Sequence, residues 1–294
     1  MIFYRICILI FGCFLLLNLS AQEQSKELCG ITYSVSQIKN DSVNGRNQNF
    51  DAFVHFPLIK KDNFVMAGKV NFSQNKYQGI GDIFDLSLTT MDATLFLSKK
   101  INDNNKLQLI GKGGLYSDFK DIGWKDFRYR IGINVAHTFS EKLKVGMGIA
   151  YARQFKAHQI NPFLSVNYKI NKNFILSGLL PIKPTLTYII NENWKWSSGI
   201  TSNVESFRLS SSANNQIVEF SGWKAASDVA YTFRKKHRFS LGLSYSFQQN
   251  IRLYNDIKEN NWKIFTFNLS EKVAPFSEEK FTKLSCFIKY NFVL

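Results

Sequence analysis

Hydrophobic and polar residues alternate strictly along many segments of this chain. In HRFSLGLSYSFQQN, residues 237–250, the apolar positions are Phe239, Leu241, Leu243, Tyr245 and Phe247. The positions between them are Ser240, Gly242, Ser244, Ser246 and Gln248. A period of two predicts a β-strand with one apolar face and one face of small polar groups. Segments 127–139 and 142–155 show the same pattern, so the sequence predicts an all-β protein.

The two faces of these strands differ in a way that indicates their surroundings. In segment 142–155, large apolar residues such as Val145 and Met147 alternate with Lys144, Gly146 and Gly148. A soluble sandwich would pack a face of Gly, Ala, Ser and Lys poorly. An outer-membrane barrel exposes its large apolar residues to lipid and its small or charged residues to the lumen. The pattern therefore predicts a transmembrane β-barrel.

Turn signals along the chain predict the number of strands. Short polar turns occur at 60–63, 101–105, 140–142, 171–173, 191–193 and 234–237, and longer polar stretches near 39–48, 75–84, 118–125, 156–159, 210–216 and 252–279. Alternating short and long connections are typical of barrels with tight periplasmic turns and longer external loops. Six short turns imply seven up-and-down pairs, hence a single antiparallel barrel of about 14 strands.

One of these pairs must be unusually short. Segment 174–190 has to cross and return within 17 residues, and Pro181 and Pro184 remove backbone donors where the reversal would lie. If these two strands fail to span the membrane, 12 full strands remain as the fallback.

The N-terminus predicts an export signal. Arg5 supplies a positive charge, residues 6–17 an apolar run, and 19–21 a small-residue cleavage site before Gln22. An uncleaved anchor needs a longer apolar run, and a lipoprotein signal at Cys13 would leave the following apolar residues in the mature chain. We expect a signal peptide at 1–21 and an outer-membrane barrel at 22–294.

Only Cys29 and Cys286 remain after the signal is removed, on the first and last predicted strands. These strands are neighbours in a closed barrel, so a disulfide is geometrically conceivable. Two unpaired small apolar residues are the alternative that we expect.

Charge and aromatic content narrow the possible partners. The chain of 294 residues has a formal charge of +15, with 27 Phe and 12 Tyr. The basic residues are spread through strands and turns, without a basic helix or nucleic-acid-binding motif, so we expect no nucleic-acid partner. The expected partners are outer-membrane lipid and, during biogenesis, the barrel-assembly machinery. The many aromatic residues suit the aromatic girdles that barrels have at the membrane interface.

A set of basic residues takes the same parity as the small polar positions, which predicts that they line the lumen. The set comprises Lys69, Lys112, Arg128, Arg130, Lys144, Lys169, Lys283 and Lys289. A lumen lined in this way would concentrate anions. The alternative is that these cations pair with inward acids such as Asp51 and Asp228, or lie near the ends of the barrel.

Catalytic and metal motifs are missing from the sequence. The histidines, His55, His137, His158 and His237, show no metal-ligand spacing, and no GxSxG nucleophile elbow is present. We therefore expect no catalytic residue, metal or cofactor, and a barrel hydrolase is the least favoured reading.

The longest predicted loop, 252–279, contains Trp262, Phe265, Phe267 and Phe276. Exposed aromatic residues are unfavourable in water, so we expect this loop to pack, either as a lid over the mouth or as a hairpin above the membrane. The alternative is that 262–269 is itself a membrane strand.

Four segments carry a resemblance to a known group of proteins. They are the signal ending in LSAQ, the pattern FDAFVHFPLIKKDNFVMAGKVNF at 50–72, LLPIKPTLTYIINENWKW at 179–196 and YNF near the C-terminus. Together they resemble Bacteroidota-type uncharacterised outer-membrane β-barrels, which are classed as domains of unknown function. The resemblance implies a fold and a location and brings no catalytic residues.

Two classes of function remain open. The first is a narrow, porin-like channel or transporter for small solutes. The second is a non-conducting barrel that serves envelope integrity or adhesion. No plug is visible, because only about seven residues precede the first predicted strand.

Overall fold

The structure is a computed structural model that describes residues 27–39, 44–81, 83–155, 157–210, 216–255, 261–264, 267–269 and 274–294. Its elements are β1 (Glu27–Lys39), β2 (Asn44–Lys61), β3 (Phe64–Gln78), β4 (Ser87–Lys100), β5 (Asn105–Ser117), the 3-10 turn η2 (Trp124–Asp126), β6 (Phe127–Thr138), β7 (Leu143–Arg153), β8 (Ala157–Lys169), β9 (Phe174–Leu180), β10 (Lys183–Ile189), β11 (Trp194–Arg208), β12 (Ile217–Phe233), β13 (His237–Tyr254), β14 (Asn261–Ile264), β15 (Phe267–Asn268) and β16 (Ser277–Val293). The expected signal peptide, 1–21, lies outside the described residues.

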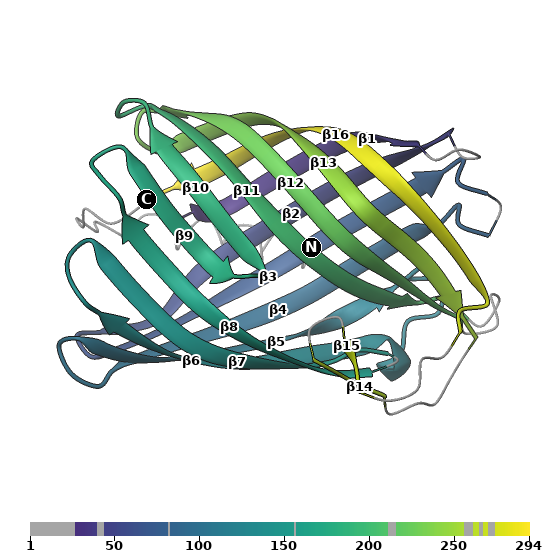
Figure 1. The fold of residues 1–294 in the computed structure, drawn as a ribbon, viewed down its shortest axis with the longest axis horizontal. Coiled ribbons are helices and arrows are strands. Elements are labelled where there is room, and N and C mark those ends of the chain that lie inside the picture. The colour runs from purple at the N-terminus through teal and green to yellow at the C-terminus, as the bar shows by residue number, and fades with distance from the viewer. Residues whose placement is uncertain are drawn as a thin grey trace, which may run out of the picture.

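Fourteen strands, β1 to β13 and β16, form one closed antiparallel barrel (Figure 1). Each strand pairs with the next along the chain, β16 pairs with both β13 and β1, and β8 pairs with β9. The predicted fold class and the count of 14 strands are therefore confirmed. Among the residues that the structure describes, no helix has the length and apolar character needed to cross a bilayer.

The apolar face of the strands lies on the outside of the barrel. On β13, Leu241 and Leu243 are 62% and 60% exposed. Ser244, on the opposite face of the strand, is 6% exposed. Large apolar side chains on a closed barrel cannot face water at this density without an energetic penalty. The outer face is therefore built for lipid, and the barrel has the architecture of an outer-membrane protein.

The six predicted short turns lie between β2 and β3, β4 and β5, β6 and β7, β8 and β9, β10 and β11, and β12 and β13. We call this end of the barrel the short-turn end. The first residue of β1 and the last residue of β16 also lie at this end, where Glu27 pairs with Val293. We call the opposite end, where the longer connections lie, the long-loop end.

Several of the predicted long loops are shorter than the sequence indicated. Residues 44–48, 75–78, 157–159 and 277–279 belong to strands β2, β3, β8 and β16. The longest strands have 18 residues. At roughly 3.3 Å per residue and a tilt of about 45°, such a strand rises about 42 Å, more than the apolar band of about 25 Å. The ends of these strands therefore extend beyond the membrane. Their residues are polar because they face water, so in the sequence they resemble loop residues.

The segment 174–190 forms the predicted pair of short strands, β9 and β10, with 7 residues each. A tilted strand of this length rises only about 16 Å, so the pair cannot cross the apolar band. Figure 1 shows β9 and β10 ending well before β8 and β11 on either side. The wall thus has 14 strands in its short-turn half and 12 in its long-loop half.

A compact apolar core fills the long-loop end of the lumen. Its buried members are Ile38, Tyr77, Ile80, Phe84, Leu88, Tyr116, Phe207, Leu209, Val218, Phe220, Ile251, Leu253 and Phe281. They come from β1, β3, β4, β5, β11, β12, β13 and β16, from the loop between β3 and β4, and from Leu209 after β11. Tyr77 stacks on Phe220 with ring centroids 5.0 Å apart. The core therefore occupies the space through which a solute moving along the barrel axis would pass.

A β-bulge in β13 directs two of these core residues inward. The pairing of β13 with β16 shifts between Ser246 and Gln249, and Gln248 has a positive φ of 52°. An extra residue in one strand reverses the faces that follow it. Ile251 and Leu253 share odd numbering with the lipid-facing Leu241, yet they lie inside the barrel.

The long connection between β13 and β16 packs, as predicted, in the form of a hairpin. β14 pairs with β15 and lies parallel to β8, from Asn261 opposite Ala157 to Ile264 opposite Ile160. The Trp262 ring stacks on His158 at 4.8 Å. Residues 262–264 are therefore not a membrane strand. Phe265 and the side chain of Phe267 lie outside the described part of the chain.

The two cysteines are free thiols. They lie on neighbouring strands, as expected, but Cys29 pairs with Phe292 and Cys286 with Val35. Six residues of strand, roughly 20 Å, separate them along the ladder, so no bridge can form between them.

Candidate functional site: the lumen and the polar seam

The short β9–β10 hairpin leaves two strand edges without a full partner. β9 pairs with β8 only from Leu164 to Lys169, and β10 pairs with β11 only up to Gly199, followed by one hydrogen bond from Ser202 N to Ile182 O. The long-loop half of β8 takes β14 as its partner instead. The wall between β8 and β11 is consequently not closed by a β-ladder in this half.

The long-loop half of β11 instead lies against the inner face of β5 to β7. Arg208 at the end of β11 pairs with Ser117 of β5 in parallel. Ser206, which has outward parity on β11, is only 1% exposed because the inward-facing Arg128 and Gln154 cover it. The two layers are thus in side-chain contact where no backbone ladder joins them.

Polar side chains hold these layers together, and we call this contact the polar seam. It comprises Asp118, Asp121, Asp126, Arg128, Gln154, Ser206, Arg208 and Ser210. The Arg208 guanidinium donates to Asp126, which is fully buried, and to Asp121 Oδ1 at 2.8 Å. Asp118 Oδ2 accepts a hydrogen bond from Ser210 N at 3.1 Å. The loop before β6 is therefore anchored to the end of β11.

Arg128 lies at the centre of the polar seam. Its Nη1 donates to Ser206 Oγ at 2.9 Å and to Gln154 Oε1. The guanidinium carbon lies 3.7 Å from the centroid of the Tyr116 ring, and the rings of Phe155 and Phe207 are within 6 Å. These contacts fix the guanidinium in place, with 7% of the residue exposed.

A separate polar cavity of about 330 Å³ opens in the short-turn half of the lumen. Two ion pairs line it: Arg238 Nη1 with Glu27 Oε1 at 3.3 Å, and Lys289 Nζ with Asp228 Oδ1 at 3.4 Å. Lys195 lines the same cavity, and no ion pair joins it to a carboxylate of the described residues. This end of the lumen is therefore polar and carries an excess of positive charge.

The predicted basic residues pair with a carboxylate, contact a neutral side chain on the inner face, or lie away from the middle of the lumen. Lys112 and Lys289 pair with Asp92 (2.9 Å) and Asp228, as the alternative interpretation anticipated for Asp228. Lys283 Nζ donates to Asn47 Oδ1 at 3.2 Å, and Lys69 Nζ lies 4.4 Å from the centroid of the Phe53 ring.

The remaining predicted cations lie away from the middle of the lumen. Arg128 belongs to the polar seam, and Arg130 is exposed beside it. Lys144 and Lys169 are exposed near the short-turn end, which also matches the alternative interpretation.

Several charged residues of the inner face were not singled out from the sequence. They are Glu27, Asp92, Lys195, Glu205, Lys224 and Arg238. Arg208, which has outward parity on β11, was also not singled out. Strand parity alone could have identified Lys195 and Lys224, which alternate with apolar neighbours in β11 and β12. The role of Arg208 could not be found in this way, because it depends on β11 crossing to β5.

The four histidines form no catalytic arrangement. Their ring nitrogens bond the Glu27 carbonyl, Asn105, Tyr151 with Arg153, and Tyr290. No serine or carboxylate side chain is among these partners. Nor does the described part of the chain contain a cluster of three or more side chains suited to a metal ion.

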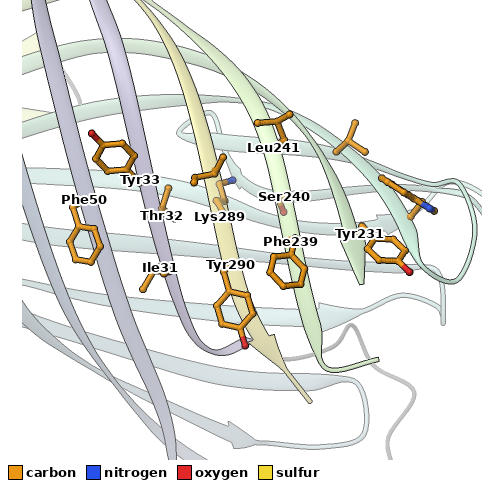
Figure 2. Close-up of a pocket in the computed structure, with 13 residues that line it drawn as sticks. Ile31, Thr32, Tyr33, Phe50, Tyr231, Phe239, Ser240, Leu241, Lys289 and Tyr290 are labelled. Atoms are coloured by element: carbon orange, nitrogen blue, oxygen red, sulfur yellow. The ribbon is translucent and has the colours of Figure 1, made fainter. Parts of the chain in front are cut away.

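A further hollow, of about 750 Å³, lies on the outer face and not in the lumen. Figure 2 shows Phe50, Tyr290, Phe239 and Tyr231 in a band across β2, β16, β13 and β12. Aromatic bands of this kind mark the membrane interface of barrels. We therefore assign this hollow to the lipid-facing surface.

The chain is similar in architecture to several solved barrels. The NanC porin is 8% identical, with a TM-score of 0.41, and the match covers 90% of this chain and 100% of that one. An outer membrane channel from Pseudomonas putida F1 is 10% identical, with a TM-score of 0.49 and coverage of 94% and 100%. The TodX monoaromatic hydrocarbon channel, as a deletion mutant, is 11% identical, with a TM-score of 0.39 and coverage of 93% and 91%.

Sequence comparison gives the family. No curated protein matches the chain. Residues 21–274 match a family described as "Domain of unknown function (DUF6268)". Because this match spans most of the barrel, the chain belongs to the DUF6268 family.

Proposed function

We propose that this protein is a narrow, anion-preferring channel or transporter for small solutes in the outer membrane. The observation that carries the proposal is the uncompensated positive charge of the lumen. Lys69 and Lys283 lie on the inner face of the barrel, and neither forms an ion pair with a carboxylate of the described residues. Low-dielectric walls focus the field of such charges, which raises the local concentration of anions.

The proposal includes a location and an orientation. Export would use cleavage after Ala21, with insertion by the barrel-assembly machinery into a Bacteroidota-type, Gram-negative outer membrane. The short-turn end would face the periplasm and the long-loop end the outside, as is usual for such barrels. Neither an enzymatic activity nor a nucleic-acid partner forms part of this proposal.

Reversal potentials in a planar bilayer test the ion preference. Under a KCl gradient, the wild-type protein should give a reversal potential with the sign for chloride. Replacing both inner cations, Lys69→Glu with Lys283→Glu, should move the potential toward the value for potassium. The control, Lys120→Glu with Lys125→Glu, changes two exposed residues between β5 and β6 by the same total charge and should leave the potential in place. A cation-selective wild type, or equal effects of both variants, would refute the proposal.

A non-conducting barrel is the second candidate, because the apolar core fills the long-loop end of the lumen. Such a core dewets the axial path and restricts ion flow. Reconstituted protein that is folded and inserted but carries no current would favour this candidate, with a role in envelope integrity or adhesion.

A further inference from the structure

We propose that the polar seam contains a binding site for an oxyanion, a carboxylate or phosphate, carried at the end of an apolar body. The site is a cavity of about 100 Å³ between β5, β6, β7 and the inner layer formed by β11. A carboxylate or phosphate group fits such a space, whereas the apolar body would have to extend out of it. The inference extends the proposed function, on which its biological use rests.

The first argument is the buried guanidinium of Arg128. Its Nε is buried and has no hydrogen-bond partner among the described residues. The neighbours of Nη1, Ser206 and Gln154, are neutral, and the salt bridges of the described part include none on Arg128. A buried cation without a carboxylate is costly, and a free N–H of a guanidinium is suited to an oxyanion. Arg128 is therefore the anchoring group of the site.

The second argument is the charge of the cavity lining. Lys112, Arg130 and Arg153 line the cavity together with Arg128. Glu205 is the carboxylate in this lining, and Asp92 pairs with Lys112 from outside it. Positive groups thus exceed negative ones around the open space, which favours an anion over a neutral or cationic ligand.

The third argument concerns the apolar body of the ligand. Tyr129, which follows Arg128 and has outward parity on β6, is among the residues that line the cavity. Tyr129 belongs to a row of aromatic rings that runs along the outer ends of β6 to β8. The row consists of Trp124, Phe127, Tyr129, Tyr151 and Trp262, with successive centroids 6.0 to 6.4 Å apart. An apolar chain can lie along these rings while its anionic end reaches Arg128.

Binding to purified protein in a neutral maltoside detergent tests the site without any ion flow. The ligand is 11-(dansylamino)undecanoic acid, whose emission rises in apolar surroundings. Dodecanoate should displace it at least ten-fold more effectively than dodecanol, which lacks the charge. Sodium acetate and inorganic phosphate should displace it poorly. Displacement by phosphate as strong as by dodecanoate would refute the requirement for an apolar body, and equal displacement by dodecanol would refute the anion site.

Variants of the protein distinguish binding of the ligand at this site from partition of the ligand into detergent micelles. Arg128→Gln should weaken binding at least ten-fold, and Arg128→Lys, which keeps the charge but not the planar fork, should weaken it less. Arg46→Gln removes an exposed arginine of β2 away from the cavity and should bind as the wild type does. Equal affinities of Arg128→Gln and Arg46→Gln would overturn the proposal.

A measurement on the wild-type protein covers the case in which Arg128 variants fail to fold. A dodecanoate with a diazirine at its carboxyl end should label peptides that contain lining residues, within 112–116, 128–130, 152–154 or 204–205. Labelling confined to other peptides would overturn the site. Because neither experiment measures current, a failure here is distinct from a failure of the channel proposal.

Discussion

The two halves of the barrel use the same strands but close their walls by different means. In the short-turn half, 14 strands form an unbroken β-ladder around a polar, basic lumen. In the long-loop half, β9 and β10 are missing from the wall, and β11 lies against β5 to β7 through side chains. The lumen there is filled with an apolar core.

This difference shows how the strand edges of an interrupted barrel wall can be covered in part by other segments of the chain. A gap in the ladder within the hydrocarbon region would expose free N–H and C=O groups, each costing several kcal/mol. Here β14 covers part of the β8 edge, and the end of β11 turns to β5. The interrupted half should accordingly depend on individual side chains far more than the continuous half does.

The largest expected effect is at Arg208. Arg208→Ala leaves the carboxylate of Asp126, which is fully buried, without its cation. Removing one partner of a buried ion pair costs about 3–5 kcal/mol. Urea unfolding in detergent should show this loss, while Arg46→Ala on exposed β2 should change the free energy of unfolding by about 0.5 kcal/mol or less. Equal losses would show that the polar seam does not hold the two layers together.

A pair of leucines on β13 compares the core with the lipid-facing surface. Both Leu253→Ala and Leu241→Ala lose the transfer free energy of the removed methyl and methylene groups, roughly 2 kcal/mol. Leu253 is 1% exposed in the core, so its truncation also leaves a cavity, for a total of about 3–5 kcal/mol. Lipid or detergent chains refill the space at Leu241, which is 62% exposed. A larger loss at Leu241 would contradict the assignment of the outer face to lipid.

The same leucine variants sharpen the comparison of the two lumen halves. Leu253→Ala should raise single-channel conductance because it thins the apolar core, whereas Leu241→Ala should not. Unchanged conductance in Leu253→Ala would place the narrowest point elsewhere.

The smallest expected effect is at the β14–β15 hairpin. Trp262→Ala removes the stacking on His158 and should cost about 1 kcal/mol, because Trp262 is 42% exposed. Limited proteolysis should then cut the chain between 255 and 276 faster than in the wild type. Trp124→Ala, at a site 88% exposed, is the control and should leave the cleavage rate unchanged. No acceleration in Trp262→Ala would mean that another contact holds the hairpin.

The sequence by itself determined the fold of this protein. Strict alternation, six short turns and a face of Ser, Gly and Lys are local signals, so the barrel, its 14 strands and the short pair at 174–190 could be predicted from them. Lys69 and Lys283 could be placed on the inner face for the same reason.

Only the tertiary structure decided how the long-loop half is closed. Leu253 falls in the predicted loop 252–279, and the odd-numbered parity of 237–250, if continued, would put Ile251 on the lipid face. The structure extends β13 to Tyr254, and the bulge at Gln248 directs both residues into the core. Likewise, no local pattern indicates that Ser206 of β11 meets Arg128 of β6, 78 residues away. Parity assigns a side chain to a face, but bulges and strand crossings are set by packing between distant segments, which a local pattern does not record.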